Sequence, residues 1–178
     1  MGPDEIKRGE YLALRRVYQP ATVRLAIVAE SPPASGKYFY NPSGAVTEPL
    51  FAAMMRQLRC SPATKEQGLE MFRQGGWVLV DATYQPVNNL SDTGRNKVIA
   101  DDYPTLRADL NDLMFDRKAP VILIKANVCR LLESKLTEDR FEVLNRRRVV
   151  SFPSNGRQNE FHKQFGSILG LIDPPSTI

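Results

Sequence analysis

Short runs of consecutive apolar residues alternate along the chain with segments in which apolar residues recur every three or four positions. Four of the runs have the composition of β-strands, and they cover Val23–Ala29, Trp77–Ala82, Val121–Ile124 and Arg148–Phe152. The central runs are continuously apolar, as is typical of parallel strands that are buried on both faces. We therefore predict a sheet of about four strands, most of them parallel.

The segments around these runs have helical periodicity. Thr47, Glu48 and Pro49 form a start signal, because they offer a capping oxygen, an acid in the first turn and a proline where no donor is missed. That helix is expected to end near Arg59. Other helices are predicted over about residues 3–18, centred on Ile6–Tyr18, and over Lys65–Gln74, Tyr103–Phe115, Asn127–Lys135 and Asn159–Leu171. Strands that alternate with helices predict a three-layer α/β/α domain with right-handed crossovers.

The length and composition indicate one globular domain. A chain of 178 residues with 42% hydrophobic and 25% charged residues can bury a core of its own and is not typical of disorder. We expect a single domain over residues 1–178, with its core at about 20–172 and a frayed tail at 173–178.

Several classes of protein are disfavoured. The two cysteines, Cys60 and Cys129, are too few for a disulfide framework and form no metal cluster, so neither a metal nor another cofactor is expected. The first apolar run is too short and too charged for a signal peptide or membrane span. We therefore predict a soluble, cytoplasmic protein without a membrane partner; the sequence does not indicate its oligomeric state.

The net charge of +4 fits a polyanionic partner such as DNA, because Lys and Arg neutralise phosphates. Many basic proteins of this size bind no anion, so charge alone does not select this partner. Ligands of open α/β sheets bind beyond the carboxyl ends of the strands. The loops that leave those ends are Glu30–Val46, Thr83–Asn96, Lys125–Asn127 and Pro153–Gln158.

The first of these loops carries the principal catalytic candidate. Glu30 directly follows a buried strand, where a carboxylate can serve as a general base or an electrostatic stabiliser, or can simply cap a helix. The aromatic residues Tyr38, Phe39 and Tyr40 follow it, and exposed aromatic rings can stack on a base. Their alternative role is to seal the edge of the cleft. Asp81, at the end of the next strand, can accept hydrogen bonds from a ligand.

Candidate phosphate contacts lie on two other loops. Arg95 and Lys97 are the cations of the second loop, whose remaining Asn, Asp, Ser and Gly residues also favour ordinary turns. The fourth loop leads into a helix, and its amide, hydroxyl and guanidinium donors suit a phosphate at a helix amino terminus. These donors belong to Ser154, Asn155, Gly156 and Arg157. The only histidine, His162, is expected at the surface.

A phosphate-binding P-loop is a near match in the first loop, where Gly36-Lys37 follows a strand. The motif fails because Ser31 stands at its first glycine and Tyr38 at its magnesium-binding hydroxyl. Nucleotide hydrolysis is therefore disfavoured, although a small-nucleotide enzyme stays an alternative.

The ordered set of loops resembles the uracil-DNA glycosylase superfamily, nearest to the members whose first motif reads Gly-Glu-Ala-Pro-Gly. Ala29-Glu30-Ser31-Pro32 stands in that place, and Gly36-Lys-Tyr-Phe39 looks like the family's Gly-Arg-Pro-Phe segment. Val78-Leu-Val-Asp81 through Pro86 is similar to the strand and loop with the uracil-reading Asn. The segment from Pro120 to Leu132 looks like the following strand and helix, and Val149-Val-Ser-Phe-Pro-Ser154 falls where the family has His-Pro-Ser.

The resemblance implies a uracil-DNA glycosylase-like fold and a DNA glycosylase that hydrolyses an N-glycosidic bond of a flipped, deaminated base. Glu30 would be catalytic, and Phe39 would stack on the base. Other base contacts would come from Tyr38, Asp81, Phe152 and Ser154.

Two departures separate this chain from the family pattern. Phe152 replaces the His of His-Pro-Ser and cannot donate a hydrogen bond to the base carbonyl, which typically costs ~3 kcal/mol. Asp81 replaces Asn and, if ionised, would suit a base with an exocyclic amine better than uracil. The alternative function is therefore a catalytically degenerate nucleic-acid-binding or repurposed module on the same scaffold.

Overall fold

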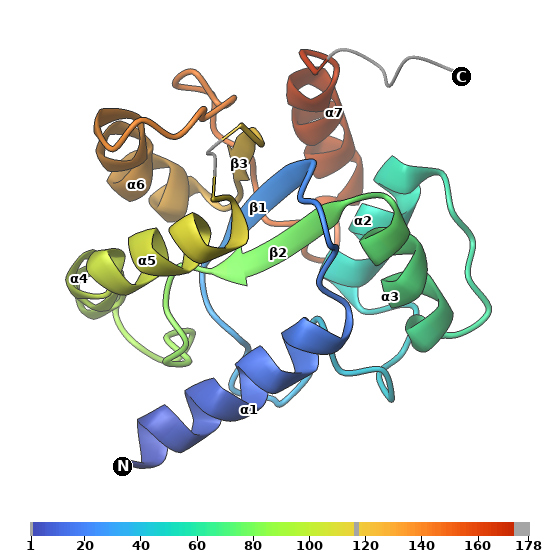
Figure 1. The fold of residues 1–178 in the computed structure, drawn as a ribbon, viewed down its shortest axis with the longest axis horizontal. Helices are drawn as coiled ribbons and strands as arrows, with labels where there is room; N and C mark the ends of the chain where they lie inside the picture. The colour runs from blue at the N-terminus through green and yellow to red at the C-terminus, as the bar shows by residue number, and fades with distance from the viewer. Residues whose placement is uncertain (1, 116–117, 173–178) are drawn as a thin grey trace.

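The structure, a computed structural model, describes residues 2–115 and 118–172. Three parallel strands, β1 (Leu25–Ala29), β2 (Trp77–Asp81) and β3 (Val121–Leu123), form a sheet in the order β2-β1-β3 (Figure 1). The helices along the chain are α1 (Pro3–Val17), α2 (Pro49–Leu58), α3 (Lys65–Gln74), α4 (Asp92–Asp101), α5 (Tyr103–Leu113), α6 (Ala126–Glu138) and α7 (Gln158–Leu169). The predicted α/β class with a parallel sheet is confirmed, and the tail predicted at 173–178 lies outside the described residues.

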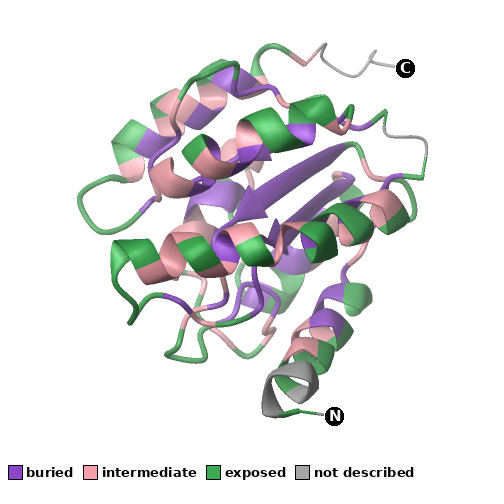
Figure 2. Cartoon of the chain, turned by 90° about the vertical axis from the view of Figure 1, so that its left-hand side faces the viewer, coloured by how far each residue is buried: buried purple, intermediate pink, exposed green. Residues whose placement is uncertain are grey.

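Both faces of the sheet are covered by helices. Alternate residues of β1 enter two separate cores: Leu25 and Ile27 join one, and Ala26 and Val28 the other. The first core is shared with α2, α3 and α7, and the second with α4, α5 and α6. Figure 2 shows the strands buried throughout and the outer faces of the helices exposed. Burial on both faces explains why the strands read as unbroken apolar runs.

The prediction of a fourth strand at Arg148–Phe152 is wrong. The described sheet has three strands, and the edge of β3 is instead closed by a side chain. Asn145 Oδ1 accepts the Leu123 amide at 2.8 Å, and Asn145 Nδ2 donates to the Leu123 carbonyl at 3.0 Å. The chain bulges outward before Val150 accepts the Lys125 amide at 2.7 Å. The segment therefore runs beside β3 without a continuous ladder.

The second predicted loop, Thr83–Asn96, is also partly wrong, because α4 begins within it. Ser91 caps this helix by accepting the Gly94 amide at 3.2 Å, and Asp92 stands in its first turn. Ser and Asp residues also favour turns, so the sequence pattern is compatible with a loop as well as with the start of a helix.

The other helices lie close to their predicted places, and α3 has the predicted bounds. The start of α2 differs, since it begins at Pro49 with Glu48, rather than Thr47, at the N-cap position. Glu48 makes no cap bond to the helix; its carboxylate instead accepts from Lys65 at 2.6 Å and from the Ala45 amide at 3.0 Å. Lys65 is buried and holds the loop before α2 in place, because it also donates to the Tyr38 carbonyl at 2.8 Å.

The helix α1 is tied to α5 by a buried ion pair. Arg15 donates to both carboxylate oxygens of Asp109, each at 2.6 Å, and to the hydroxyl of Tyr84 at 2.9 Å. In the parts of the chain that the structure describes, no helix has the length and apolar character that crossing a membrane requires.

Candidate functional site at the carboxyl ends of the strands

The loops that leave β1 and β2 begin side by side. Ala29 and Asp81 are register partners, so the two strands end at the same level of the sheet. A pocket of about 330 Å³ lies at this edge. It gathers five predicted site residues, namely Glu30, Tyr38, Phe39, Asp81 and Phe152. Glu30, Asp81 and Phe152, which the sequence places at the ends of three β-type runs, thus meet at this edge of the sheet.

Glu30 is the centre of a buried polar cluster. One carboxylate oxygen accepts from Lys125 Nζ at 2.6 Å, and the other accepts from Asn127 Nδ2 at 2.6 Å. Arg95 Nε lies 3.9 Å from the first oxygen. Because the two cations Lys125 and Arg95 face the single carboxylate of Glu30, the net charge of this cluster is positive. These hydrogen bonds use two of the about four acceptor positions of a carboxylate, so Glu30 can still accept a hydrogen bond from water.

Lys125 and Asn127 are site residues that the sequence reasoning did not single out. Lys125 has φ 78° and ψ 134°, a conformation that side chains other than glycine rarely adopt and that costs of order 1–3 kcal/mol. In this conformation the residue ends β3, starts α6 and places its ammonium on Glu30. The available signal was the polar Lys-Ala-Asn step directly after an apolar run.

Asp81 is buried at the inner wall of the pocket. Burial, opposed by the nearby Arg15 and reinforced by Asp109 and Glu30, raises the pKa of its carboxyl to about 8. Its Oδ2 atom is buried without a hydrogen-bond partner among the described residues. A carboxyl group that keeps its proton near neutral pH both donates and accepts, unlike the ionised Asp81 considered from sequence.

Tyrosine side chains surround this carboxyl. The hydroxyl of Tyr38 is, like Asp81 Oδ2, buried and without a hydrogen-bond partner in the described part of the chain. Burial and the neighbouring Asp81 raise the pKa of Tyr38. Tyr11 packs on Tyr38 with ring centroids 4.6 Å apart, and Tyr84 closes the other side. Two buried polar atoms without partners in neighbouring side chains are unusual, and each is fully covered, so a bound ligand reaches it only if these side chains move.

The expectation that Tyr38, Phe39 and Tyr40 are exposed is wrong. Their exposed fractions are 3%, 5% and 0%, because the aromatic core reaches up to this loop. Phe39 packs edge-on against Phe72 at 5.1 Å, and the Tyr40 hydroxyl bonds the Leu79 backbone. Tyr38 and Phe39 nevertheless line the pocket, so they can contact only a ligand that enters it.

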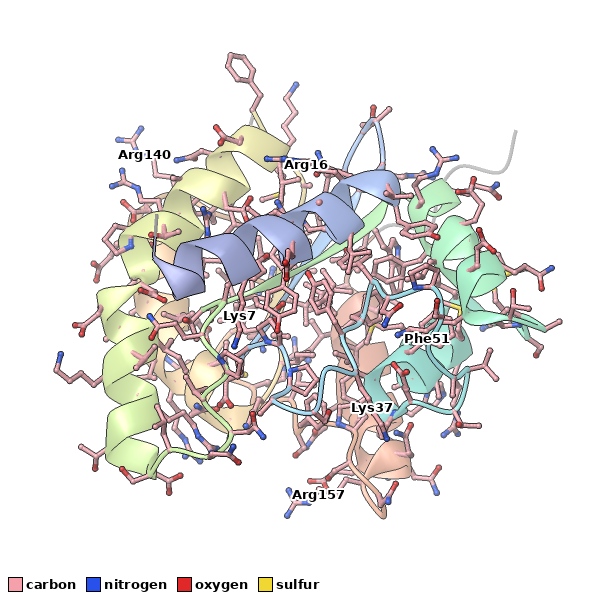
Figure 3. The ribbon with its side chains drawn as sticks, turned by 90° about the horizontal axis from the view of Figure 1, so that it is seen from below. Lys7, Arg16, Lys37, Phe51, Arg140 and Arg157 are labelled. Carbon is pink, nitrogen blue, oxygen red and sulfur yellow. The ribbon has the colours of Figure 1, made fainter. Side chains whose placement is uncertain are left out.

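The predicted phosphate contacts are more dispersed. Arg95 stands beside Glu30, whereas Lys97 lies two residues further along α4, is exposed and pairs with Asp101 at 2.5 Å. The loop with Ser154, Asn155, Gly156 and Arg157 is exposed and does not line the pocket. Arg157 is the N-cap residue of α7 and makes no side-chain cap bond. Figure 3 shows Arg157 at the margin of the molecule, well away from Arg140. His162 is half-buried between α7 and α2, 2.8 Å from Gln57 Nε2, and is not a surface residue.

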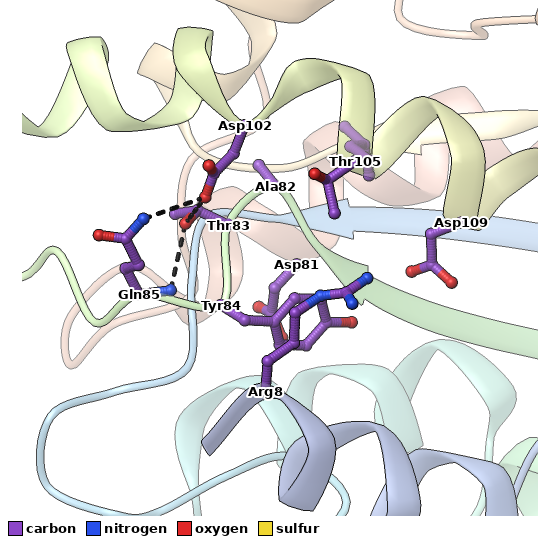
Figure 4. A pocket seen from close by; sticks show the side chains of 10 residues that line it. Arg8, Asp81, Ala82, Thr83, Tyr84, Gln85, Asp102, Thr105 and Asp109 are labelled. Atoms are coloured by element: carbon purple, nitrogen blue, oxygen red, sulfur yellow. Dashed lines mark hydrogen bonds between the residues drawn. The ribbon is translucent and has the colours of Figure 1, made fainter. Parts of the chain in front are cut away.

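A second cavity, of about 370 Å³, lies on the other side of Asp81 (Figure 4). Arg8 extends over the ring of Tyr84 at 5.8 Å, and Asp102 accepts from the Thr83 hydroxyl at 2.5 Å. Asp81 is therefore the partition between two cavities.

Comparison of the chain with protein-family models, with curated proteins and with solved structures finds no match.

Proposed function

We propose that the chain is a divergent uracil-DNA glycosylase-like protein that binds DNA and accommodates a flipped, deaminated base in the pocket at the carboxyl ends of β1 and β2. One observation carries this proposal. Residues from four loops far apart in the sequence, including Glu30, Asp81 and Phe152, line one pocket of about 330 Å³. That volume and the aromatic walls suit a planar heterocycle.

The pocket offers a stacking surface and a hydrogen-bonding wall. Phe39 and Phe152 supply apolar contacts for the faces of a ring. Asp81 and Tyr38 supply the polar wall; Asp81 Oδ2 and the Tyr38 hydroxyl are buried without partners among the described residues, so small side-chain movements would have to expose them to a base. A protonated Asp81 can donate to a base carbonyl while it accepts from the adjacent ring N–H, an edge that uracil and hypoxanthine share.

Glu30 is the catalytic candidate. Once a base is seated, its carboxylate would stabilise the positive charge that develops on the sugar, or would position the attacking water. Lys125 and Asn127 hold the carboxylate in one orientation at 2.6 Å each. Their role in this mechanism is to position Glu30.

The non-enzymatic alternative has support of its own. Glu30 is held by Lys125 and Asn127, an arrangement that fits structural support as well as catalysis, and Phe152 offers no donor to a base carbonyl. Loss of one such donor typically lowers the rate by roughly two orders of magnitude. In this alternative the same pocket captures a base without excising it.

Single-turnover excision on duplexes with uracil or hypoxanthine tests the proposal. We expect slow excision by the wild type, a large loss of rate in Glu30→Gln, and faster uracil excision in Phe152→His because a donor is restored. Glu66→Gln, on the exposed surface of α3, is the matched control and should behave as the wild type.

Equal rates in the wild type and Glu30→Gln would remove Glu30 from the mechanism. Binding without excision by any variant, on either base, would select the capture module. Absence of both binding and excision would refute the proposed function.

A further inference from the structure

A second positively charged surface lies beside β3, on the side of the molecule that α6 covers. The helix α6 and the segment 147–149 line a groove of about 530 Å³. Arg130, Arg147 and Arg148 line it, together with the hydroxyl residues Ser134 and Thr137 and the acids Glu133 and Glu138. None of these residues belongs to the pocket with Glu30.

Most of the arginine side chains on this surface are not bound to other groups of the described chain. Within residues 2–115 and 118–172, the side chains of Arg130, Arg146 and Arg147 make no hydrogen bond or ion pair, and all three are exposed. Arg148 differs, since its Nε donates to the Asn145 carbonyl at 3.3 Å and its Nη1 to Ser167 at 3.4 Å. Three cations are thus available to a partner.

The backbone that carries these arginines is strained and held in place. Arg140, Arg146 and Arg147 have φ values of 68°, 47° and 66°, in the left-handed region that favours glycine. The Arg147 amide donates to Glu133 Oε1 at 2.7 Å, and Asn145 Nδ2 donates to the Arg148 carbonyl at 3.1 Å. A strained bulge fixed from both sides presents its side chains at low entropic cost.

The charge of the groove favours an anion despite its two acids. Arg130, Arg147 and Arg148 line it with three positive charges against the two of Glu133 and Glu138, and Arg146 directly precedes Arg147 in the chain. One oxygen of Glu133 is already taken by the Arg147 amide. Guanidinium groups match phosphate oxygens through paired N–H donors, and the nearby Ser134 and Thr137 hydroxyls can donate to the same group.

The helix α6 connects the candidate site with the groove. This helix begins next to Lys125, which holds Glu30, and reaches Arg130 about one turn later. A long polyanion seated at the pocket can therefore follow α6 into the groove, whereas a small anion would occupy only one end of it.

We propose that the groove between α6 and the arginine bulge is a second binding surface for the sugar-phosphate backbone of double-stranded DNA. The proposal rests on the DNA-binding part of the proposed function and adds contacts that read no sequence. Arg130, Arg146 and Arg147 bind phosphates beyond those near the pocket. These contacts strengthen binding to damaged and undamaged duplexes alike.

The test measures binding of the full-length protein to an undamaged duplex oligonucleotide as a function of salt. The variant Arg130→Gln/Arg146→Gln/Arg147→Gln should bind more weakly, and its slope of log K against log salt should be shallower by about two to three, because each phosphate contact contributes about 0.9. The matched control Arg16→Gln/Arg24→Gln/Arg59→Gln removes three exposed arginines elsewhere and should keep the wild-type slope. Circular dichroism spectra of both variants should match that of the wild type, which checks that they are folded.

Each outcome separates the two proposals. If the wild type binds and the groove variant keeps its slope, the groove is refuted and the function proposed for the pocket stands. If the groove variant loses binding but Arg95→Gln and Glu30→Gln have no effect on binding or excision, the groove stands and the function proposed for the pocket fails. Equal losses of affinity in the groove and control variants would show that affinity depends only on net charge, and would refute the proposed role of the groove. A wild type that binds no duplex refutes both.

Discussion

Asp81 holds a position at which a carboxyl group is costly unless it keeps its proton. It ends β2, separates two cavities and has one oxygen without a hydrogen-bond partner among the described residues. Burial raises the pKa of this group to about 8. A neutral Asp81 can offer both a hydrogen-bond donor and an acceptor to a ligand.

This state of Asp81 makes stability depend on pH. The folded protein keeps a proton that the unfolded chain releases above its ordinary pKa of 3.8, up to a pH of about 8. The free energy of unfolding should therefore fall as pH rises through this window, by at most about 1.4 kcal/mol per pH unit. Asp81→Asn removes the titration, so its stability relative to the wild type should increase with pH.

Urea unfolding of both proteins at several pH values between about 5 and 8 measures the difference. Curves that stay parallel across this range would show that Asp81 is ionised in the folded state, and would remove the donor that the pocket needs for a base carbonyl.

The residues that end strands could be predicted from sequence, and the residues that complete the site could not. Glu30 and Asp81 directly follow unbroken apolar runs, so their place at the edge of a parallel sheet follows from the pattern. Lys125 and Asn127 stand in an equivalent place, but their pairing with Glu30 depends on the left-handed backbone of Lys125, which no local pattern indicates. The burial of Phe39 likewise depends on contacts with Phe72 across the fold.

Among the elements, α1 depends most on a single interaction. Arg15 and Asp109 form a two-pronged ion pair whose side chains are only 5% and 10% exposed, and this pair joins α1 to α5. Removal of one partner from a buried pair leaves the other charge uncompensated, which costs more than loss of the contact itself.

We therefore expect Asp109→Asn to lower the free energy of unfolding by about 3 kcal/mol and to increase amide hydrogen exchange in α1. Asp112→Asn, on the exposed face of the same helix, should change stability by no more than about 0.5 kcal/mol. Equal effects of the two substitutions, or unchanged exchange in α1, would contradict the role assigned to the ion pair.

Among the helices and strands, a helix with a regular apolar face could be predicted from sequence. The helix α4 and the segment at the edge of the sheet could not. The helix α3 has its predicted bounds because Thr64 caps it and its apolar face is regular. The helix α4 has a single buried residue, Ile99, so it carries almost no apolar periodicity. The run Arg148–Phe152 reads as a strand, but the side chain of Asn145 already occupies the hydrogen-bonding edge that such a strand would need.

On the scale of the whole molecule, two groups of cations concern the proposed binding of DNA: those near the pocket and those of the groove beside α6. At the rim, Arg95 is partly neutralised by Glu30 and Lys97 by Asp101, whereas Arg157 is exposed at the start of α7. Of the phosphate contacts predicted from sequence, Arg157 is therefore the one we expect to contribute most to DNA affinity.

DNA affinity should fall steeply with salt, and Arg157→Gln should make the slope of log K against log salt shallower by about 0.9. Lys97→Gln should change it less, because Lys97 already has Asp101 as a partner at 2.5 Å. Titrations of one duplex at several salt concentrations provide the slopes. Affinity that does not change with salt would point to a partner other than nucleic acid.

The central claim is that the pocket takes up a base. The most direct test places 2-aminopurine beside a uracil in duplex DNA, because the fluorescence of 2-aminopurine rises when the neighbouring base leaves the stack. Ser35 lines the pocket and Ser43 does not, although both are exposed on the same loop. We predict a rise in fluorescence with the wild type and with Ser43→Trp, and none with Ser35→Trp, whose indole fills the pocket. Equal rises with both variants, or no rise with the wild type under conditions where it binds the duplex, would contradict the claim.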